Sequence, residues 1–145
     1  MRLLISAGFA LSMLALGCSG EASSTGGSGA EATFPAEPLA TVVTDQGLSI
    51  EVRTAPEQPP ARGVIDVELM VSDADGKPVD GLDLAVQPWM PQMGHGASTK
   101  PSIEAMGGGH YVVSKVAFFM PGQWELRTSI AGAMNDSATV NFQIH

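Results

Sequence analysis

The sequence predicts an all-β domain, an immunoglobulin-like β-sandwich of about seven short antiparallel strands. After residue 38, short runs of alternating apolar and polar residues recur between turn residues, at a spacing of roughly 8–12 residues. The chain has 17 Gly and 10 Pro, which is typical of a turn-rich β protein. A length of 145 residues favours one folded domain, which we place at residues 39–145.

The strands follow one another along this domain. The first alternates cleanly and ends at a proline-rich stretch that begins at Pro56. The second leads into the turn 73–78, where Asp75-Gly76 tolerates a positive φ. Gly107–Gly109 and Pro121-Gly122 mark two later turns. The expected strands are residues 48–53, 64–71, 82–90, 102–106, 111–119, 124–130 and 138–144.

The N-terminal residues have the pattern of an export signal and are not expected to be part of the folded domain. A basic start, Met1-Arg2, precedes the apolar run Leu3–Gly17, which is shorter than the about 20 residues that span a bilayer. The run ends in Leu-Ala-Leu-Gly before Cys18, which resembles a bacterial lipoprotein signal. We therefore expect residues 1–17 to be removed and Cys18 to be lipidated. The alternative is an ordinary export signal that leaves Cys18 as a free thiol.

The segment 18–38 is rich in Gly, Ser, Ala and Glu and has no apolar period. Such a segment buries too little surface to offset the entropy of ordering it, so we expect a flexible tether. With a lipid anchor at Cys18, the protein would lie in the cell envelope, on the periplasmic face of a membrane.

Charge and composition exclude several functions. A net charge of -8 argues against a nucleic-acid partner, because few cations are present to neutralise phosphates. A single Cys excludes an internal disulfide framework and a thiolate-rich metal site. The sequence has no serine nucleophile elbow, and Gly107–Gly109 lacks the lysine and the helix of a phosphate loop. We expect a protein that is not an enzyme.

The segment 89–96, Trp-Met-Pro-Gln-Met-Gly-His-Gly, carries an unusual set of soft metal ligands. Met90, Met93 and His95 offer two thioethers and an imidazole within a loop interrupted by Pro and Gly. Thioethers are soft and uncharged, so they favour Cu(I) over Zn²⁺, Ca²⁺ or Mg²⁺. The alternative is that Met90 and Met93 cap the hydrophobic core while His95 is a solvated loop residue.

The order of the strands predicts which other residues reach this loop. Counting the alternating strand directions from Met90 places Met120 at the same end of the domain, as a third sulfur ligand. The alternative is that Met120 is a core residue below the turn. The same count places His145 at that end as well. It places Met106, His110 and Met134 at the opposite end, where they do not contribute.

These motifs resemble those of a known family. Trp89-Met90-Pro91-x-Met93-Gly94-His95-Gly96, then Gly109-x-Tyr111, then Phe118-x-Met120-x-Gly122-x-Trp124-x-Leu126 occur in the order typical of the YtkA-like family, which is related to FixH proteins. The resemblance covers about residues 40–144. It implies a small immunoglobulin-like β-sandwich and a role in handling copper in the periplasm. FixH proteins carry a transmembrane helix, whereas this chain carries a lipoprotein-like signal.

Two functions are therefore expected. One is a membrane-tethered copper-binding protein that holds Cu(I) through Met90, Met93, His95 and Met120, and passes it to a copper-recipient protein. The other is an interaction module that binds no metal and docks a cell-envelope partner through an exposed strand edge.

Overall fold

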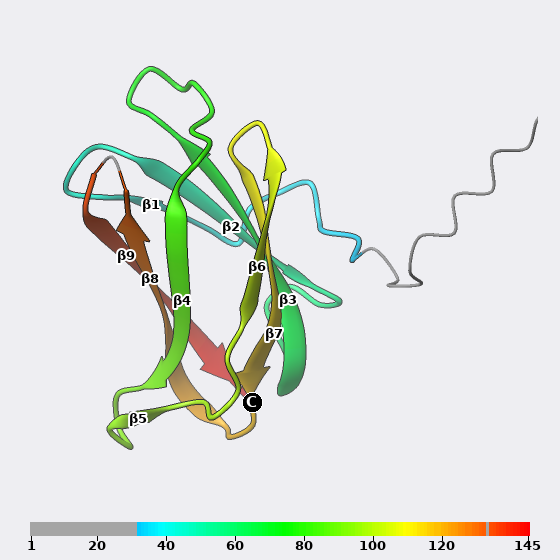
Figure 1. Cartoon of the computed structure of the whole chain (residues 1–145). Coiled ribbons are helices and arrows are strands. Elements are labelled where there is room, and N and C mark those ends of the chain that lie inside the picture. Colours follow the sequence, from blue (N-terminus) through cyan, green and yellow to red (C-terminus); the bar gives the residue numbers. More distant parts are fainter. Residues whose placement is uncertain (1–31, 133) are drawn as a thin grey trace, which may run out of the picture. The chain divides into compact units, whose positions relative to one another are not determined.

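The folded domain is a β-sandwich (Figure 1). The computed structural model describes residues 32–132 and 134–145. The expected signal peptide, Cys18 and the tether up to residue 31 lie outside the described residues. In the part that is described, no helix is long and apolar enough to cross a membrane.

Two antiparallel sheets form the sandwich. One has the strand order β1-β2-β3-β7-β6, and the other has the order β5-β4-β8-β9. The strands are β1 Ala40–Val43, β2 Ser49–Ala55, β3 Gly63–Ser72, β4 Asp83–Met90, β5 His95–Gly96, β6 Ser102–Gly107, β7 His110–Phe118, β8 Gly122–Ala131 and β9 Asp136–Ile144.

The all-β sandwich is confirmed, and all seven expected strands are present. The structure adds two short strands, β1 with 4 residues and β5 with 2. β1 is joined to β2 through pairs such as Val42 with Ile50. β5 is too short to produce a period in the sequence, and it exists because the chain turns back on the end of β4.

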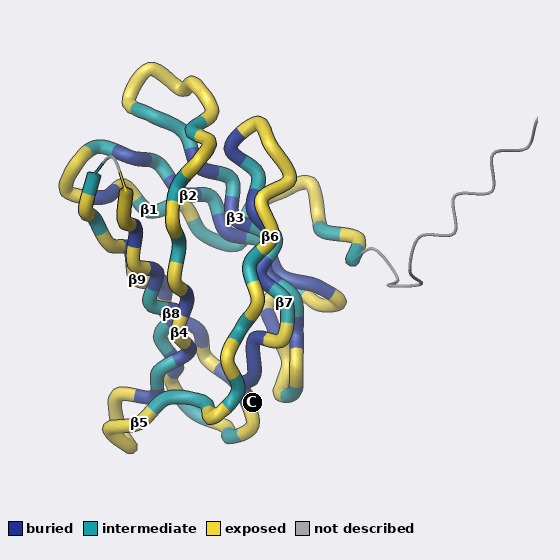
Figure 2. The backbone as a smooth tube through the Cα atoms, in the orientation of Figure 1, coloured by how far each residue is buried: buried dark blue, intermediate teal, exposed yellow. Residues whose placement is uncertain are grey.

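The core lies between the sheets, and along strands such as β2 and β9 buried residues alternate with more exposed ones (Figure 2). Its largest side chain is that of Trp124, which is 1% exposed. The Phe118 ring packs edge-on against Trp124 and Phe142, with ring centroids 5.3 Å and 5.7 Å away. Such edge-to-face pairs add to the free energy gained from burying the rings.

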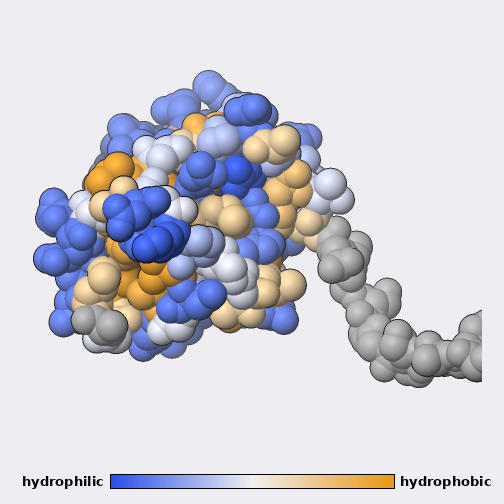
Figure 3. All heavy atoms as spheres, turned by 90° about the horizontal axis from the view of Figure 1, so that it is seen from above, coloured by the Kyte–Doolittle hydropathy of each residue, from blue (hydrophilic) through white to orange (hydrophobic). Residues whose placement is uncertain are grey.

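Consecutive antiparallel strands give the sandwich two ends, which we name for their side chains. The aspartate end carries the turns 44–48, 73–82 and 107–109 and the connection from β8 to β9; it is uppermost in Figure 1. The methionine end carries the loop 56–62, the hairpin 91–94, the crossing segment 97–101 and the turn 119–121. Figure 3, a view from above, shows many hydrophilic residues around the aspartate end.

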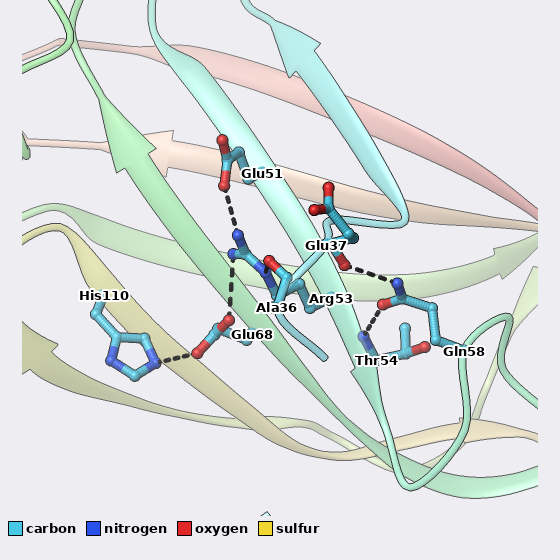
Figure 4. A network of polar contacts seen from close by, with 8 residues as sticks. All are labelled: Ala36, Glu37, Glu51, Arg53, Thr54, Gln58, Glu68 and His110. Atoms are coloured by element: carbon cyan, nitrogen blue, oxygen red, sulfur yellow. Dashed lines mark hydrogen bonds and ion pairs between the residues drawn. The ribbon is translucent and has the colours of Figure 1, made fainter. Parts of the chain in front are cut away.

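The last residues of the expected tether are held against the domain (Figure 4). Arg53 Nε donates to the Ala36 carbonyl at 3.2 Å, and Gln58 Nε2 donates to the Glu37 carbonyl at 2.8 Å. Arg53 also pairs with Glu51 at 2.8 Å and with Glu68 at 3.3 Å. The chain is therefore attached to the edge of the sandwich before β1 begins.

Candidate metal centre

Met90 and His95 face each other across the first two strands of the smaller sheet. They are register partners between β4 and β5. The Met90 carbonyl accepts hydrogen bonds from the amides of Met93 and Gly94, at 3.1 Å and 3.0 Å. The turn requires φ = 68° at Gly94, a conformation that glycine adopts without strain. Residues 91–94 therefore form a tight loop that presents Met93 at its tip.

Met90 also reaches the turn that carries Met120. Met90 is only 4% exposed, and its terminal methyl lies 2.6 Å from the point where a Cβ on Gly122 would stand. Any larger residue at 122 would have to displace the Met90 side chain. The Trp124 indole nitrogen donates to the Met120 carbonyl at 2.8 Å, which holds the turn in place. Met90 thus lies between the strand of His95 and the turn of Met120.

The four candidate ligands differ in their exposure. Met93 is 56% exposed, His95 is exposed, Met120 is partly buried against the core, and Met90 is buried. Register partners in an antiparallel pair project to the same face of the sheet, with Cβ atoms about 5 Å apart. His95 therefore shares the inward face of Met90, at the edge of the sandwich where β5 projects beyond the core.

The hydrogen bond of His95 is compatible with metal binding. His95 Nδ1 lies 3.2 Å from the Gly96 carbonyl. With the proton on Nδ1, this carbonyl orients the ring and Nε2 keeps the lone pair that a metal ion needs. Gly96 allows the backbone of β5 to approach β4 closely, because a Cβ at position 96 would lie 2.7 Å from the Pro88 carbonyl oxygen.

The loops around these ligands carry no acidic residue. Residues 91–101 and 119–122 contain no Asp or Glu, and Lys100 is their one charged side chain. Ca²⁺ and Mg²⁺ prefer oxygen ligands, and carboxylates above all. Within the described residues, no three His, Cys, Asp or Glu side chains gather as a metal-binding group. The soft donors of these two segments are thioethers and imidazole, a set that fits Cu(I).

The remaining Met and His residues considered as ligands lie at the ends of the domain that strand counting predicts. Met106, His110 and Met134 are at the aspartate end, on β6, on β7 and in the turn before β9. His110 Nε2 is 2.9 Å from Glu68 Oε1, on the outer face of the larger sheet (Figure 4). Ile144 pairs with Gly122, so His145 is a second imidazole at the methionine end.

The aromatic residues near this end take different places. Trp124 and Phe118 belong to the core, whereas Phe119 is 53% exposed. Trp89 lies on the outer face of the smaller sheet, with the Arg127 guanidinium 4.6 Å from its ring centroid. Trp89 faces away from Met90, because adjacent residues in a strand point to opposite faces. It cannot shield a metal held on the inner face.

The second motif, Gly109-x-Tyr111, serves the aspartate end. The Tyr111 hydroxyl donates to the Val79 carbonyl at 3.0 Å and accepts from the Leu82 amide at 3.2 Å. Both carboxylate oxygens of Asp80 accept hydrogen bonds, from the amides of Gly108 at 3.1 Å and Gly109 at 2.8 Å. These contacts fasten the long turn before β4 to the β6–β7 turn.

The sequence model of the YtkA-like family matches residues 43–129. This range runs from the end of β1 to the last residues of β8, and it includes Met90, Met93, His95 and Met120. No curated protein and no solved structure shows significant similarity to the chain.

Proposed function

The chain belongs to the YtkA-like family, and from this premise we propose that it is an exported, membrane-tethered protein that binds Cu(I) and delivers it. The observation that carries the proposal is the position of Met90. This buried side chain lies between the strand of His95 and the turn of Met120, and residues 91–101 and 119–122 contain no Asp or Glu. Soft donors without carboxylates favour a soft, monovalent cation.

Each ligand has a role that follows from its exposure. Met93 and His95 are exposed on a hairpin, so they make the first contact with an incoming ion. Met120 supplies a third donor from the facing turn, and Met90 supplies the floor of the site. A Cu(I) ion held this way remains accessible from the hairpin side. That access suits transfer to a recipient protein, since a recipient ligand can replace Met93 or His95.

The N-terminal features support the location. We propose that residues 1–17 are a lipoprotein-type signal, that Cys18 carries the lipid anchor, and that the protein lies on the periplasmic face of a membrane. The segment between Cys18 and Ala36, whose carbonyl accepts a hydrogen bond from Arg53, would then set how far the domain moves from the membrane.

The test is an anaerobic titration of the purified protein with Cu(I), in competition with a chromophoric chelator. We expect one Cu(I) per chain, and an affinity that falls roughly 100-fold or more in a Met93→Ala/His95→Ala double variant. Met120→Ala should weaken binding by roughly tenfold or more.

Met106→Ala is the matched control, since Met106 is 52% exposed and lies at the aspartate end. Its affinity should equal that of the wild type. Equal Cu(I) affinity in the wild type and the double variant would refute this assignment. Binding of Zn²⁺ in preference to Cu(I) would also contradict it.

A further inference from the structure

One edge of β4 is largely unpaired. β8 pairs with β4 from Asp83 to Trp89 on one side. On the other side, β5 pairs only with Trp89 and Met90, and the amide of Ala97 donates to the Pro88 carbonyl at 3.2 Å. No other described strand pairs with this second edge over residues 83–87.

The free hydrogen-bonding groups of this edge can be assigned. In an antiparallel sheet, the N–H and C=O of one residue face the same neighbour, and alternate residues face opposite neighbours. Because the Pro88 carbonyl faces Ala97, the main-chain groups of Val86 and Leu84 face the same open side. This edge therefore offers two N–H donors and two C=O acceptors in strand geometry.

A groove lies along this edge, between β4 and the crossing segment 97–101. The crossing segment leads from β5 to β6 (Figure 1). Its volume is about 560 Å³. The Thr99 hydroxyl oxygen beside it is shielded from solvent and has no hydrogen-bond partner among the described residues. Lys100 is the one charged residue in its lining. The apolar lining residues include Leu84, Val86, Pro88, Ala97, Pro101 and Ile103.

We propose that this groove binds an extended segment of a partner protein, which adds to β4 as a new strand in line with β5. The free N–H and C=O groups of Leu84 and Val86 can pair with the main chain of an extended segment, as in the addition of a strand to a sheet. Leu84 and Val86 point into the core side of the sheet, so the segment must place apolar side chains at alternate positions. An acidic residue in the same segment would form an ion pair with Lys100. The proposal is independent of copper binding, because none of the four metal ligands lines the groove.

The probe is a fluorescent seven-residue peptide that alternates valine with threonine and carries a central glutamate in place of one threonine. In the proposed pairing, valine faces the core side and directs its N–H to β4. A peptide N-methylated at its valines should therefore bind at least tenfold more weakly, measured by fluorescence anisotropy. The same peptide N-methylated at its threonines should bind like the parent.

Two protein variants test the charge. Lys100→Gln should weaken binding by about threefold, the effect of one exposed ion pair. Lys77→Gln at the aspartate end should leave peptide binding unchanged.

Hydrogen exchange gives an independent readout that requires no variant. The amides of Leu84 and Val86 should exchange quickly in the free protein, and at least tenfold more slowly with the peptide bound.

Three results would overturn the proposal. The first is the absence of binding by the parent peptide at millimolar concentration. The second is equal binding by the two N-methylated peptides. The third is a chain that elutes as a dimer in which Leu84 and Val86 are already protected, because a second copy would then occupy the groove.

Discussion

At the aspartate end, carboxylates accept hydrogen bonds from the backbone amides of the turns, whereas at the methionine end the hairpin 91–94 and the turn 119–121 have only carbonyl acceptors. Asp73 Oδ1 accepts from the amides of Asp75 and Lys77, both at 2.9 Å. Asp136 joins the turn before β2 to the start of β9, through the Gln46 amide at 3.0 Å. The methionine end has no such contact within residues 91–101 and 119–122, which contain no Asp or Glu.

If the methionine end binds Cu(I) as proposed, the two ends of the sandwich divide stability from binding. At the aspartate end, side-chain hydrogen bonds are used to hold the turns. At the methionine end, the side chains of Met93 and His95 are exposed, and these residues support the fold through their backbone. Substitutions at the two ends should therefore have opposite consequences, and the following experiments measure how far the separation holds.

The largest effect is expected from Gly109→Ala. Gly109 has φ = 73°, and an added Cβ would lie 2.3 Å from the Val71 carbonyl oxygen. Strain and overpacking together should lower the free energy of unfolding by about 3 kcal/mol, measured by urea denaturation. Gly108→Ala is the control, because its φ is similar, 67°, and its Cβ would meet nothing within 4 Å. Equal losses in the two variants would contradict the steric argument.

A smaller effect is expected from Tyr111→Phe. The hydroxyl of this buried residue bridges Val79 and Leu82, and its loss leaves a donor and an acceptor without their partner. We expect the free energy of unfolding to fall by about 1–2 kcal/mol. Ser129→Ala, which removes an exposed hydroxyl on β8, should change it by less than about 0.5 kcal/mol. A Tyr111→Phe protein as stable as wild type would mean that water replaces both contacts.

At the methionine end, Met93→Ala and His95→Ala should each change the free energy of unfolding of the metal-free protein by less than about 0.5 kcal/mol. Both side chains are exposed, so their loss creates no cavity. The same urea titration, repeated with one equivalent of Cu(I), should stabilise the wild type and not the double variant. A loss above about 1 kcal/mol without metal would show that the hairpin also supports the fold.

The smallest effect concerns Asp136. A hydrogen bond from the Thr44 hydroxyl, with further bonds from backbone amides, lowers the pKa of Asp136 below its ordinary value of 3.8. The ionised form is thus favoured in the folded state. The resulting stabilisation is present above pH 3.8 and disappears as the pH falls through the lowered pKa. Asp136→Asn should therefore lower the urea midpoint slightly at pH 7, and the difference from wild type should shrink by pH 3. A difference in urea midpoint that stays the same from pH 7 to pH 3 would contradict the role of the Asp136 charge.

Much of the fold could be predicted from the sequence, because strand alternation and turn residues are local signals. Segments 48–53 and 138–144 alternate cleanly, and they correspond to β2 and β9. β1 and β5 were missed for a physical reason. Neither is long enough to show a period, and β5 is a strand only because the loop 91–94 returns the chain to β4.

The candidate site was predictable in part. Strand counting correctly places Met120 at the end that carries Met93 and His95. It could not predict that Met90 is buried, or that its methyl group takes the space of a side chain at position 122, because that contact joins residues far apart in the sequence. The free edge of β4 was also not apparent, since pairing depends on how short β5 is.

The unequal distribution of charge gives the domain an electric dipole. Negative charge is concentrated in the turns of the aspartate end, whereas at the methionine end Glu57 and Arg62 in the loop 56–62 balance each other and Lys100 adds a positive charge. Near a surface of anionic lipid headgroups, the field repels the aspartate end within a Debye length. If the domain is tethered to such a membrane as proposed, this repulsion would favour orientations in which Met93 and His95 face the surface.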